Sequence, residues 1–142
     1  MPLLFVYGSL KQGFPNQHVN TGRRVDGRYR TREPYPLYLL GAGEVPCIVA
    51  PAGAGQPVVG EVYEVQAGDL ARMDRLERLG EPQGYERVEI EVERVDGPTR
   101  EPLRALVYLK HEHTIPAGTA RIGPLAEYLP AHAARFHWRG AD

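Results

Sequence analysis

The chain opens with an uninterrupted apolar run. Residues 3 to 7 read Leu-Leu-Phe-Val-Tyr, and the run stops abruptly at Gly8. A run of aliphatic, β-branched and aromatic residues without polar alternation predicts a strand that is buried on both faces. Glycine accepts a positive φ and lets another group approach the backbone closely, so Gly8 predicts a tight loop directly after the strand.

The rest of the chain contains shorter strand patterns separated by glycine and proline turns. Val25 and Tyr29 are the only strong apolar anchors between residues 22 and 31, which favours a half-exposed and bulged strand there. Residues 85–95 alternate valine or isoleucine with glutamate, so these glutamates are expected on a solvated strand face. The other expected strands span residues 37–40, 47–50, 58–65 and 103–109, the last as the antiparallel partner of 85–95.

One helix is expected in the middle of the chain. Asp69 is a suitable N-cap, Gly80 supplies a stop, and leucine or methionine recurs every third residue between them. At 100° per residue, Glu77 falls between Leu70 and Met73 on the helical wheel, so its carboxylate shares the apolar face. A carboxylate that is aimed at the interior must be paired with a cation, protonated or facing a pocket.

A second helix is expected near the C-terminus. It would be amphipathic and interrupted near Pro130, because proline lacks the N–H that a helix interior uses. Its apolar face would contain Leu125, Tyr128, Leu129, Ala133 and Phe136.

Composition limits the class of protein. The 142 residues suffice for one domain with a full core, which we expect over residues 1–142. The 17 basic and 18 acidic side chains nearly cancel, which argues against a nucleic-acid partner or an anionic membrane surface and favours a small-molecule partner. The single cysteine excludes an intrachain disulfide and, without a signal-like segment, predicts a cytoplasmic protein. The sequence does not indicate an oligomeric state.

Two kinds of candidate chemistry have stronger structural explanations. Cys47 is a possible nucleophile, but it lies in an apolar Cys-Ile-Val-Ala run and is better explained as a buried thiol. His111 and His113 share one side of an extended segment, yet no third metal ligand is evident, and solvated histidines are the simpler interpretation.

The combination of the first loop and Glu77 is more informative. The N–H groups of residues 8 to 10 follow a buried strand and lack ladder partners, so they are able to hold a carboxylate or a carbonyl oxygen. Glu77 would supply a general base beside them. The alternative for Glu77 is a buried ion pair with one of the arginines, and the alternative for the loop is an ordinary turn.

These motifs resemble the gamma-glutamylcyclotransferase-like superfamily, and within it the gamma-glutamylamine cyclotransferase branch. The resemblance covers residue 3 to about residue 90. It rests on the segments LFVYGSLKQGFPNQ, REPYPL, GEVYEV, MDRLERL and GYERV.

The resemblance implies an α+β fold, a small mixed β-barrel with a packed helix that bears the catalytic glutamate. It implies no cofactor or metal, and an enzyme that releases 5-oxoproline and a free amine by intramolecular aminolysis of a γ-glutamyl compound. Glu77 matches the catalytic acid/base of the family. Tyr7, Gly8, Ser9 and Leu10 match its substrate-binding loop, with Ser9 where threonine is frequent.

Two features differ from the family pattern. The stretch between Glu77 and Tyr85 is about two residues longer, which makes Glu81 a rival for the catalytic position. From Lys110 onwards the resemblance fades, so residues 110–142 are expected to form a C-terminal extension that shapes the leaving-group pocket.

Two other classes of function remain open from the sequence. A non-catalytic module for γ-glutamyl or similar small carboxylate ligands would bind without turnover. A purely structural or interaction protein would pair Glu77 with an arginine and fill the loop with its own side chains.

Overall fold

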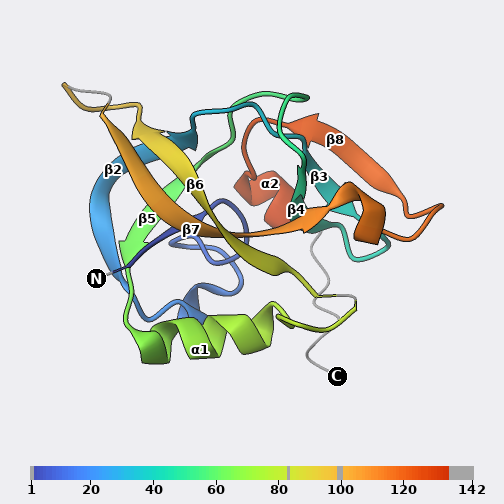
Figure 1. Cartoon of the computed structure of the whole chain (residues 1–142), viewed down its shortest axis with the longest axis horizontal. Helices are drawn as coiled ribbons and strands as arrows, with labels where there is room; N and C mark the ends of the chain where they lie inside the picture. The colour runs from blue at the N-terminus through green and yellow to red at the C-terminus, as the bar shows by residue number, and fades with distance from the viewer. Residues whose placement is uncertain (1, 83, 99–100, 135–142) are drawn as a thin grey trace.

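The computed structural model describes residues 2–82, 84–98 and 101–134. Among these residues, five strands close into a barrel (Figure 1). They are β1 (Leu3–Val6), β2 (Arg23–Thr31), β5 (Val59–Glu64), β6 (Glu86–Arg94) and β7 (Pro102–His111). Around the barrel the order is β1, β5, β2, β6, β7, and a parallel pairing of β7 with β1 closes the ring. The other four pairings are antiparallel, which confirms the predicted mixed barrel.

The first strand is buried on both faces, as its uninterrupted apolar sequence predicted. Leu4, Phe5 and Val6 are at most 3% exposed. Phe5 packs into the main core with Val107, whereas Leu4 and Val6 belong to a second cluster that contains Met73. Because neighbouring side chains of a strand point to opposite faces, β1 serves two cores and has no position for a polar residue.

Helix α1 (Ala67–Leu76) packs against the outside of β1 and β7 through the second cluster. It starts earlier than predicted. Its N-cap is Gln66, and Asp69 lies in the first turn, where its carboxylate accepts a 2.8 Å hydrogen bond from the Gln66 N–H. Glu77 is the C-cap residue rather than an interior one. No helix in the described ranges is long and apolar enough to cross a membrane.

Three further strands extend the sheet beyond the barrel. They are β3 (Leu37–Leu40), β4 (Val45–Ala50) and β8 (Arg121–Leu125). β4 runs parallel to β7, β3 pairs antiparallel with β4, and β8 pairs antiparallel with β3. Figure 1 shows β8 at the edge of this extension. The paired strands predicted at residues 37–40 and 47–50 are thus confirmed.

The prediction of an amphipathic C-terminal helix is wrong for residues 125–129, which precede the helix at Pro130. Leu125 ends strand β8, where it pairs with Leu37. The short helix α2 (Pro130–Ala133) begins at Pro130, because the first turn of a helix does not need the missing N–H. Phe136, which was expected on the apolar face, lies outside the described residues.

β2 is irregular where its sequence is polar. Its register against β5 shifts between Val25 and Tyr29, and Gly27 within this shift has a φ of 110°. The bulged and half-exposed strand expected for residues 22–31 is confirmed.

The glutamates of β6 do not all face solvent. The side chains of Glu89 and Glu91 are about half exposed, at 52% and 48%. Glu93 is only 17% exposed and forms a 2.8 Å ion pair with Arg30. The predicted solvated face is therefore wrong for Glu93, because β2 places an arginine directly opposite it.

Candidate active site

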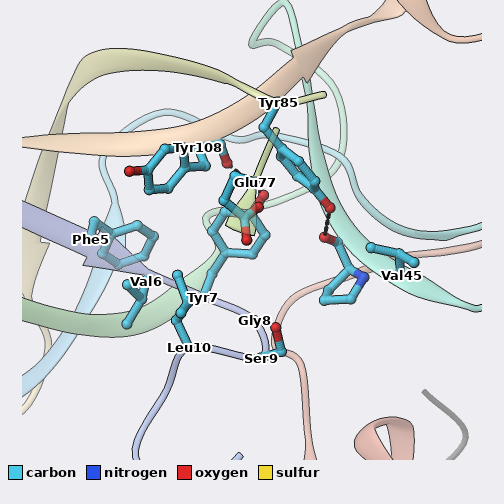
Figure 2. A pocket seen from close by; sticks show the side chains of 11 residues that line it. Phe5, Val6, Tyr7, Gly8, Ser9, Leu10, Val45, Glu77, Tyr85 and Tyr108 are labelled. Carbon is cyan, nitrogen blue, oxygen red and sulfur yellow. Dashed lines mark hydrogen bonds between the residues drawn. The ribbon is translucent and has the colours of Figure 1, made fainter. Parts of the chain in front are cut away.

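A pocket opens where β1 ends, and it contains every residue that the sequence assigned to the site (Figure 2). The space within it is about 440 Å³ when the open solvent at its mouth is included. The first loop, the β4 strand, the end of α1, and strand β7 all contribute. The lining residues are Phe5, Val6, Tyr7, Gly8, Ser9, Leu10, Val45, Pro46, Glu77, Tyr85 and Tyr108.

Position 8 requires glycine because the Pro46 side chain lies close to its backbone, not because of its dihedral angles. A Cβ atom at this position would lie 2.9 Å from Cγ of Pro46, which is closer than packed carbon atoms tolerate. Gly8 is not among the residues with positive φ, so the expected left-handed turn is not what selects glycine here. The loop therefore lies directly against β4, and this contact forms one edge of the pocket.

The loop uses its carbonyl groups to hold its own shape. The N–H of Lys11 donates to the Gly8 carbonyl at 3.1 Å, and the N–H of Asn16 donates to the Ser9 carbonyl at 2.8 Å. The Asn16 side chain also donates to Oγ of Ser9 at 2.8 Å. Within the described part of the chain, the N–H groups of Gly8, Ser9 and Leu10 have no hydrogen-bond acceptor. These N–H groups thus lack partners in the described chain, as the sequence predicted.

Tyr7 contributes its ring to the pocket while its hydroxyl holds the barrel together. The hydroxyl donates to the Tyr108 carbonyl at 2.7 Å and accepts from the Ile48 N–H at 3.0 Å. Burial raises the pKa of Tyr7 well above its usual value, so the hydroxyl stays protonated. A role for Tyr7 in proton transfer is therefore disfavoured.

Glu77 is fixed by its backbone on both sides. Its N–H donates to the Met73 carbonyl at 2.9 Å, and its own carbonyl accepts from the Tyr85 N–H at 2.9 Å. Figure 2 shows the carboxyl group among the labelled side chains of the pocket, with Tyr85 on one side and Tyr108 on the other. The chain thus places Glu77 in the pocket through the helix C-cap.

The carboxyl group of Glu77 has no hydrogen bond or ion pair to any described residue. Burial raises its pKa to about 8, against the opposing effect of the positive charge of Lys110. A buried ion pair with an arginine, which the interaction-protein hypothesis requires, is therefore wrong for the described chain. A carboxyl group with a pKa near neutrality, at the edge of a pocket, is suited to accept and return a proton.

Glu81, the rival for the catalytic position, follows the end of α1 on the outside of the protein. It is exposed, its N–H donates to the Arg78 carbonyl at 3.0 Å, and it does not line the pocket. Glu81 therefore lies away from the pocket.

Sequence reasoning missed the aromatic walls of the site. Tyr85 donates from its hydroxyl to the Pro46 carbonyl at 2.6 Å, and burial raises its pKa well above the usual value. Tyr108 lies on β7 and also lines the pocket. Both residues look like ordinary core aromatics in the sequence. A local hydrogen bond brings Tyr85 to Glu77, whereas Tyr108 is brought there by the closure of the barrel.

The other candidate residues have structural roles. Cys47 is fully buried, and burial raises the pKa of its thiol to about 12, so the buried structural thiol is confirmed. Nδ1 of His111 contacts the carboxylate of Glu86, and its ring lies 5.7 Å from that of His113. Among the described residues, no group of three histidine, cysteine or acidic side chains is placed to hold a metal ion.

Comparison with known proteins agrees with this geometry. The family model described as "Gamma-glutamyl cyclotransferase, AIG2-like" matches residues 4–127. The chain belongs to this family. The family match extends well beyond residue 90, where the recognisable motifs end, and includes β7 and β8.

Individual relatives carry related names. The chain is 36% identical over 124 residues to gamma-glutamylaminecyclotransferase B of Danio rerio, covering 80% of this chain and 61% of that protein. It is 31% identical over 141 residues to gamma-glutamylaminecyclotransferase of Mus musculus, covering 93% and 87%. The aligned region spans less than two thirds of the Danio rerio protein. It likewise covers only 63% of gamma-glutamylaminecyclotransferase of Bos taurus.

A solved structure shows the same fold over nearly the whole chain. The crystal structure of an AIG2-like protein from Mus musculus superposes with a TM-score of 0.83 at 28% identity. The match covers 98% of this chain and 97% of that one. The arrangement of barrel, outer strands and helix is thus that of the family.

Proposed function

We propose that this protein is a gamma-glutamylamine cyclotransferase, which converts a γ-glutamyl amine into 5-oxoproline and the free amine. The observation that carries the proposal is the carboxyl group of Glu77. It lines the pocket, is without a protein partner in the described chain, and has a pKa raised to about 8. The names of the relatives support this substrate class.

The reaction is an intramolecular aminolysis. The α-amino nitrogen of the γ-glutamyl unit attacks the side-chain carbonyl carbon and forms the new C–N bond of a five-membered lactam. The C–N bond to the leaving amine then breaks. The α-ammonium nitrogen loses two protons in becoming the lactam N–H, one before the attack and one after it. The leaving nitrogen takes up both and departs as an ammonium ion, so a single residue between the two atoms can carry each proton in turn.

Glu77 is the acid/base in this proposal. In its deprotonated form it removes a proton from the α-ammonium group and then gives that proton to the departing nitrogen. The second proton, which the ring nitrogen releases after the attack, follows the same route to the amine. A carboxyl group with an ordinary pKa would be a weak base for this purpose, whereas a pKa of about 8 brings it close to that of the group it deprotonates.

The first loop is proposed to bind the substrate and stabilise the negative charge of the tetrahedral intermediate. The free N–H groups of Gly8, Ser9 and Leu10 would donate to the developing oxyanion or to the substrate carboxylate. One such donor typically lowers a barrier by about 3 kcal/mol. The rings of Tyr7 and Tyr85 would hold the γ-glutamyl chain in the folded conformation that cyclisation requires.

The test is a substrate panel with two matched variants. Wild-type protein is incubated with several γ-glutamyl amines and γ-glutamyl amino acids, and 5-oxoproline is measured. Glu77→Gln keeps the shape of the side chain but removes the base, so we expect turnover to fall by about 10²- to 10⁴-fold. Glu81→Gln, in the exposed rival, should retain full activity.

Each outcome discriminates between hypotheses. Full activity of Glu77→Gln would eliminate the proposed role of this residue. Binding of the γ-glutamyl compounds by the wild-type protein without any 5-oxoproline would identify a binding module instead of an enzyme.

A further inference from the structure

Asp74 is the centre of a hydrogen-bonded network beside the pocket. Nη1 of Arg87 donates to both of its carboxylate oxygens, at 2.8 and 2.6 Å. The hydroxyl of Tyr108 donates to Oδ1 of the same carboxylate at 2.6 Å. The three side chains come from α1, β6 and β7, so the network joins the helix to two strands of the barrel.

This network is continuous with the wall of the pocket. Tyr108 lines the pocket, and its backbone carbonyl accepts the hydrogen bond from the Tyr7 hydroxyl. One chain of contacts therefore runs from Tyr7, at the start of the substrate loop, through Tyr108 to Asp74. Because Asp74 lies on the last turn of α1, the same chain reaches the turn that carries Glu77.

Backbone hydrogen bonds around the end of α1 connect Asp74 to the turn that contains Glu77. The Asp74 carbonyl accepts from the Leu79 N–H at 2.9 Å, just as the Met73 carbonyl accepts from the Glu77 N–H. These bonds wrap the end of the helix around Glu77. A shift of Asp74 away from the barrel would thus carry the carboxyl group of Glu77 with it.

We infer that Asp74 and Arg87 are positioning residues that set where the carboxyl group of Glu77 stands relative to the loop of Gly8 to Leu10. The inference rests on the proposed function. A displacement of about 1 Å in a catalytic group can cost about 100-fold in rate, whereas a partly exposed ion pair contributes little to stability. The network should therefore matter more for turnover than for folding.

The barrel offers a matched control. Arg30 and Glu93 form a similar pair, with Nε and Nη2 of Arg30 at 2.9 and 2.8 Å from one carboxylate oxygen. This pair joins β2 to β6, is also partly buried, and does not line the pocket. Removing it tests what the loss of an arginine–carboxylate pair does to this fold without any effect on Glu77.

The experiment compares Asp74→Asn, Arg87→Gln and Tyr108→Phe with the control Glu93→Gln, using a γ-glutamyl amine that the wild-type protein converts. Tyr108→Phe keeps the ring and removes only the hydroxyl that donates to Asp74. It therefore tests the same network even if Asp74→Asn does not fold. We expect kcat to fall about 10- to 100-fold for Asp74→Asn and Arg87→Gln, with KM changed less than threefold. Glu93→Gln should lower Tm about as much as Asp74→Asn does, but it should leave kcat unchanged.

A second measurement asks whether the effect passes through Glu77. In the Glu77→Gln background, Asp74→Asn should cause no further loss of kcat, because residues that act through one group are not additive. Equal kcat values for Asp74→Asn, Arg87→Gln and the Glu93→Gln control would overturn the inference. An additive loss in the double variant would do so as well. An inactive wild-type protein, or an active Glu77→Gln, would instead refute the proposed function.

Discussion

The carbonyl oxygen of Glu77 accepts a hydrogen bond of 2.9 Å from the N–H of Tyr85. This bond holds the backbone of Tyr85 next to that of Glu77, although seven residues separate them in the sequence. The hydroxyl of Tyr85 is tied in turn to the Pro46 carbonyl, next to Gly8. These two bonds thus hold Glu77 and Tyr85 beside the loop of residues 8–10.

The raised pKa of Glu77 predicts the pH dependence of turnover. Only the deprotonated carboxylate acts as a base, so kcat/KM should fall as the pH decreases below about 8. The nearby groups Tyr7, Tyr85 and Cys47 all have raised pKa values, so they stay neutral through this range. The acid limb should therefore have a slope of about one and report Glu77 alone.

Lys110 provides a test of that assignment. Its positive charge lowers the pKa of Glu77, so Lys110→Gln should raise that pKa and move the acid limb to higher pH. Arg104→Gln removes a cation from an exposed pair on the same strand and should leave the profile in place. An acid limb that stays at the same pH in Lys110→Gln would show that another group titrates.

Glu77 also predicts a pH-dependent stability. Its pKa is about 8 in the folded protein and about 4.5 ordinarily, so folding favours the protonated form. The stabilisation is complete below pH 4.5 and is lost as the pH rises to 8, because the unfolded chain releases its proton first. In this window the free energy of unfolding should fall by about 1.4 kcal/mol per pH unit through this group.

The measurement is urea unfolding of the wild type and Glu77→Gln at several pH values. The stability of Glu77→Gln relative to wild type should increase between pH 4.5 and 8 and then level off. Glu89→Gln, at a half-exposed position of β6, serves as the control. A constant difference between Glu77→Gln and wild type across the window would mean that the carboxyl group is not desolvated in the folded protein.

The sequence was sufficient for the parts of the site that depend on local signals. The apolar run before Gly8 identifies a doubly buried strand because β1 must satisfy two cores. Glu77 was recognised by its place on the apolar side of a helix, although it is the C-cap and not an interior residue. The conclusion about Glu77 holds because residues within one turn of a helix end still follow the helical direction.

The parts that could not be predicted depend on contacts between distant segments. The apolar positions around Leu125 suit a helix as well as a strand, and the choice is made by pairing with Leu37. Likewise, nothing local distinguishes Tyr108 from a core aromatic, because its neighbours in space are Tyr7 and Asp74. Barrel closure brings these residues together, and closure is a property of the whole chain.

Cys47 should be chemically inert in the folded protein. Its thiol is fully buried, and a pKa of about 12 leaves about 10³-fold less thiolate than the ordinary value of 9. Iodoacetamide at pH 8 should therefore leave the native protein unlabelled, as measured by intact mass. The same reagent should label the protein fully in urea. Rapid labelling without denaturant would contradict the burial of this residue.

Gly8→Ala should damage the site while leaving the fold in place. The new Cβ would lie 2.9 Å from Cγ and 3.3 Å from Cβ of Pro46, whose ring is held in strand β4. The loop must move away from β4, and its N–H groups then lose their alignment with the substrate. We expect kcat/KM for a γ-glutamyl amine to fall on the order of tenfold or more, with far-UV circular dichroism unchanged.

Gly68→Ala is the matched control for this substitution. Gly68 lies in the first turn of α1, and a Cβ there would meet nothing within 4 Å. Alanine is also the better helix former, so this variant should keep full activity and be at least as stable as wild type. Equal activity of Gly8→Ala and Gly68→Ala would mean that the pocket accepts the extra methyl group without moving its N–H donors. The contact between the loop and Pro46 would then not determine how the loop holds the substrate.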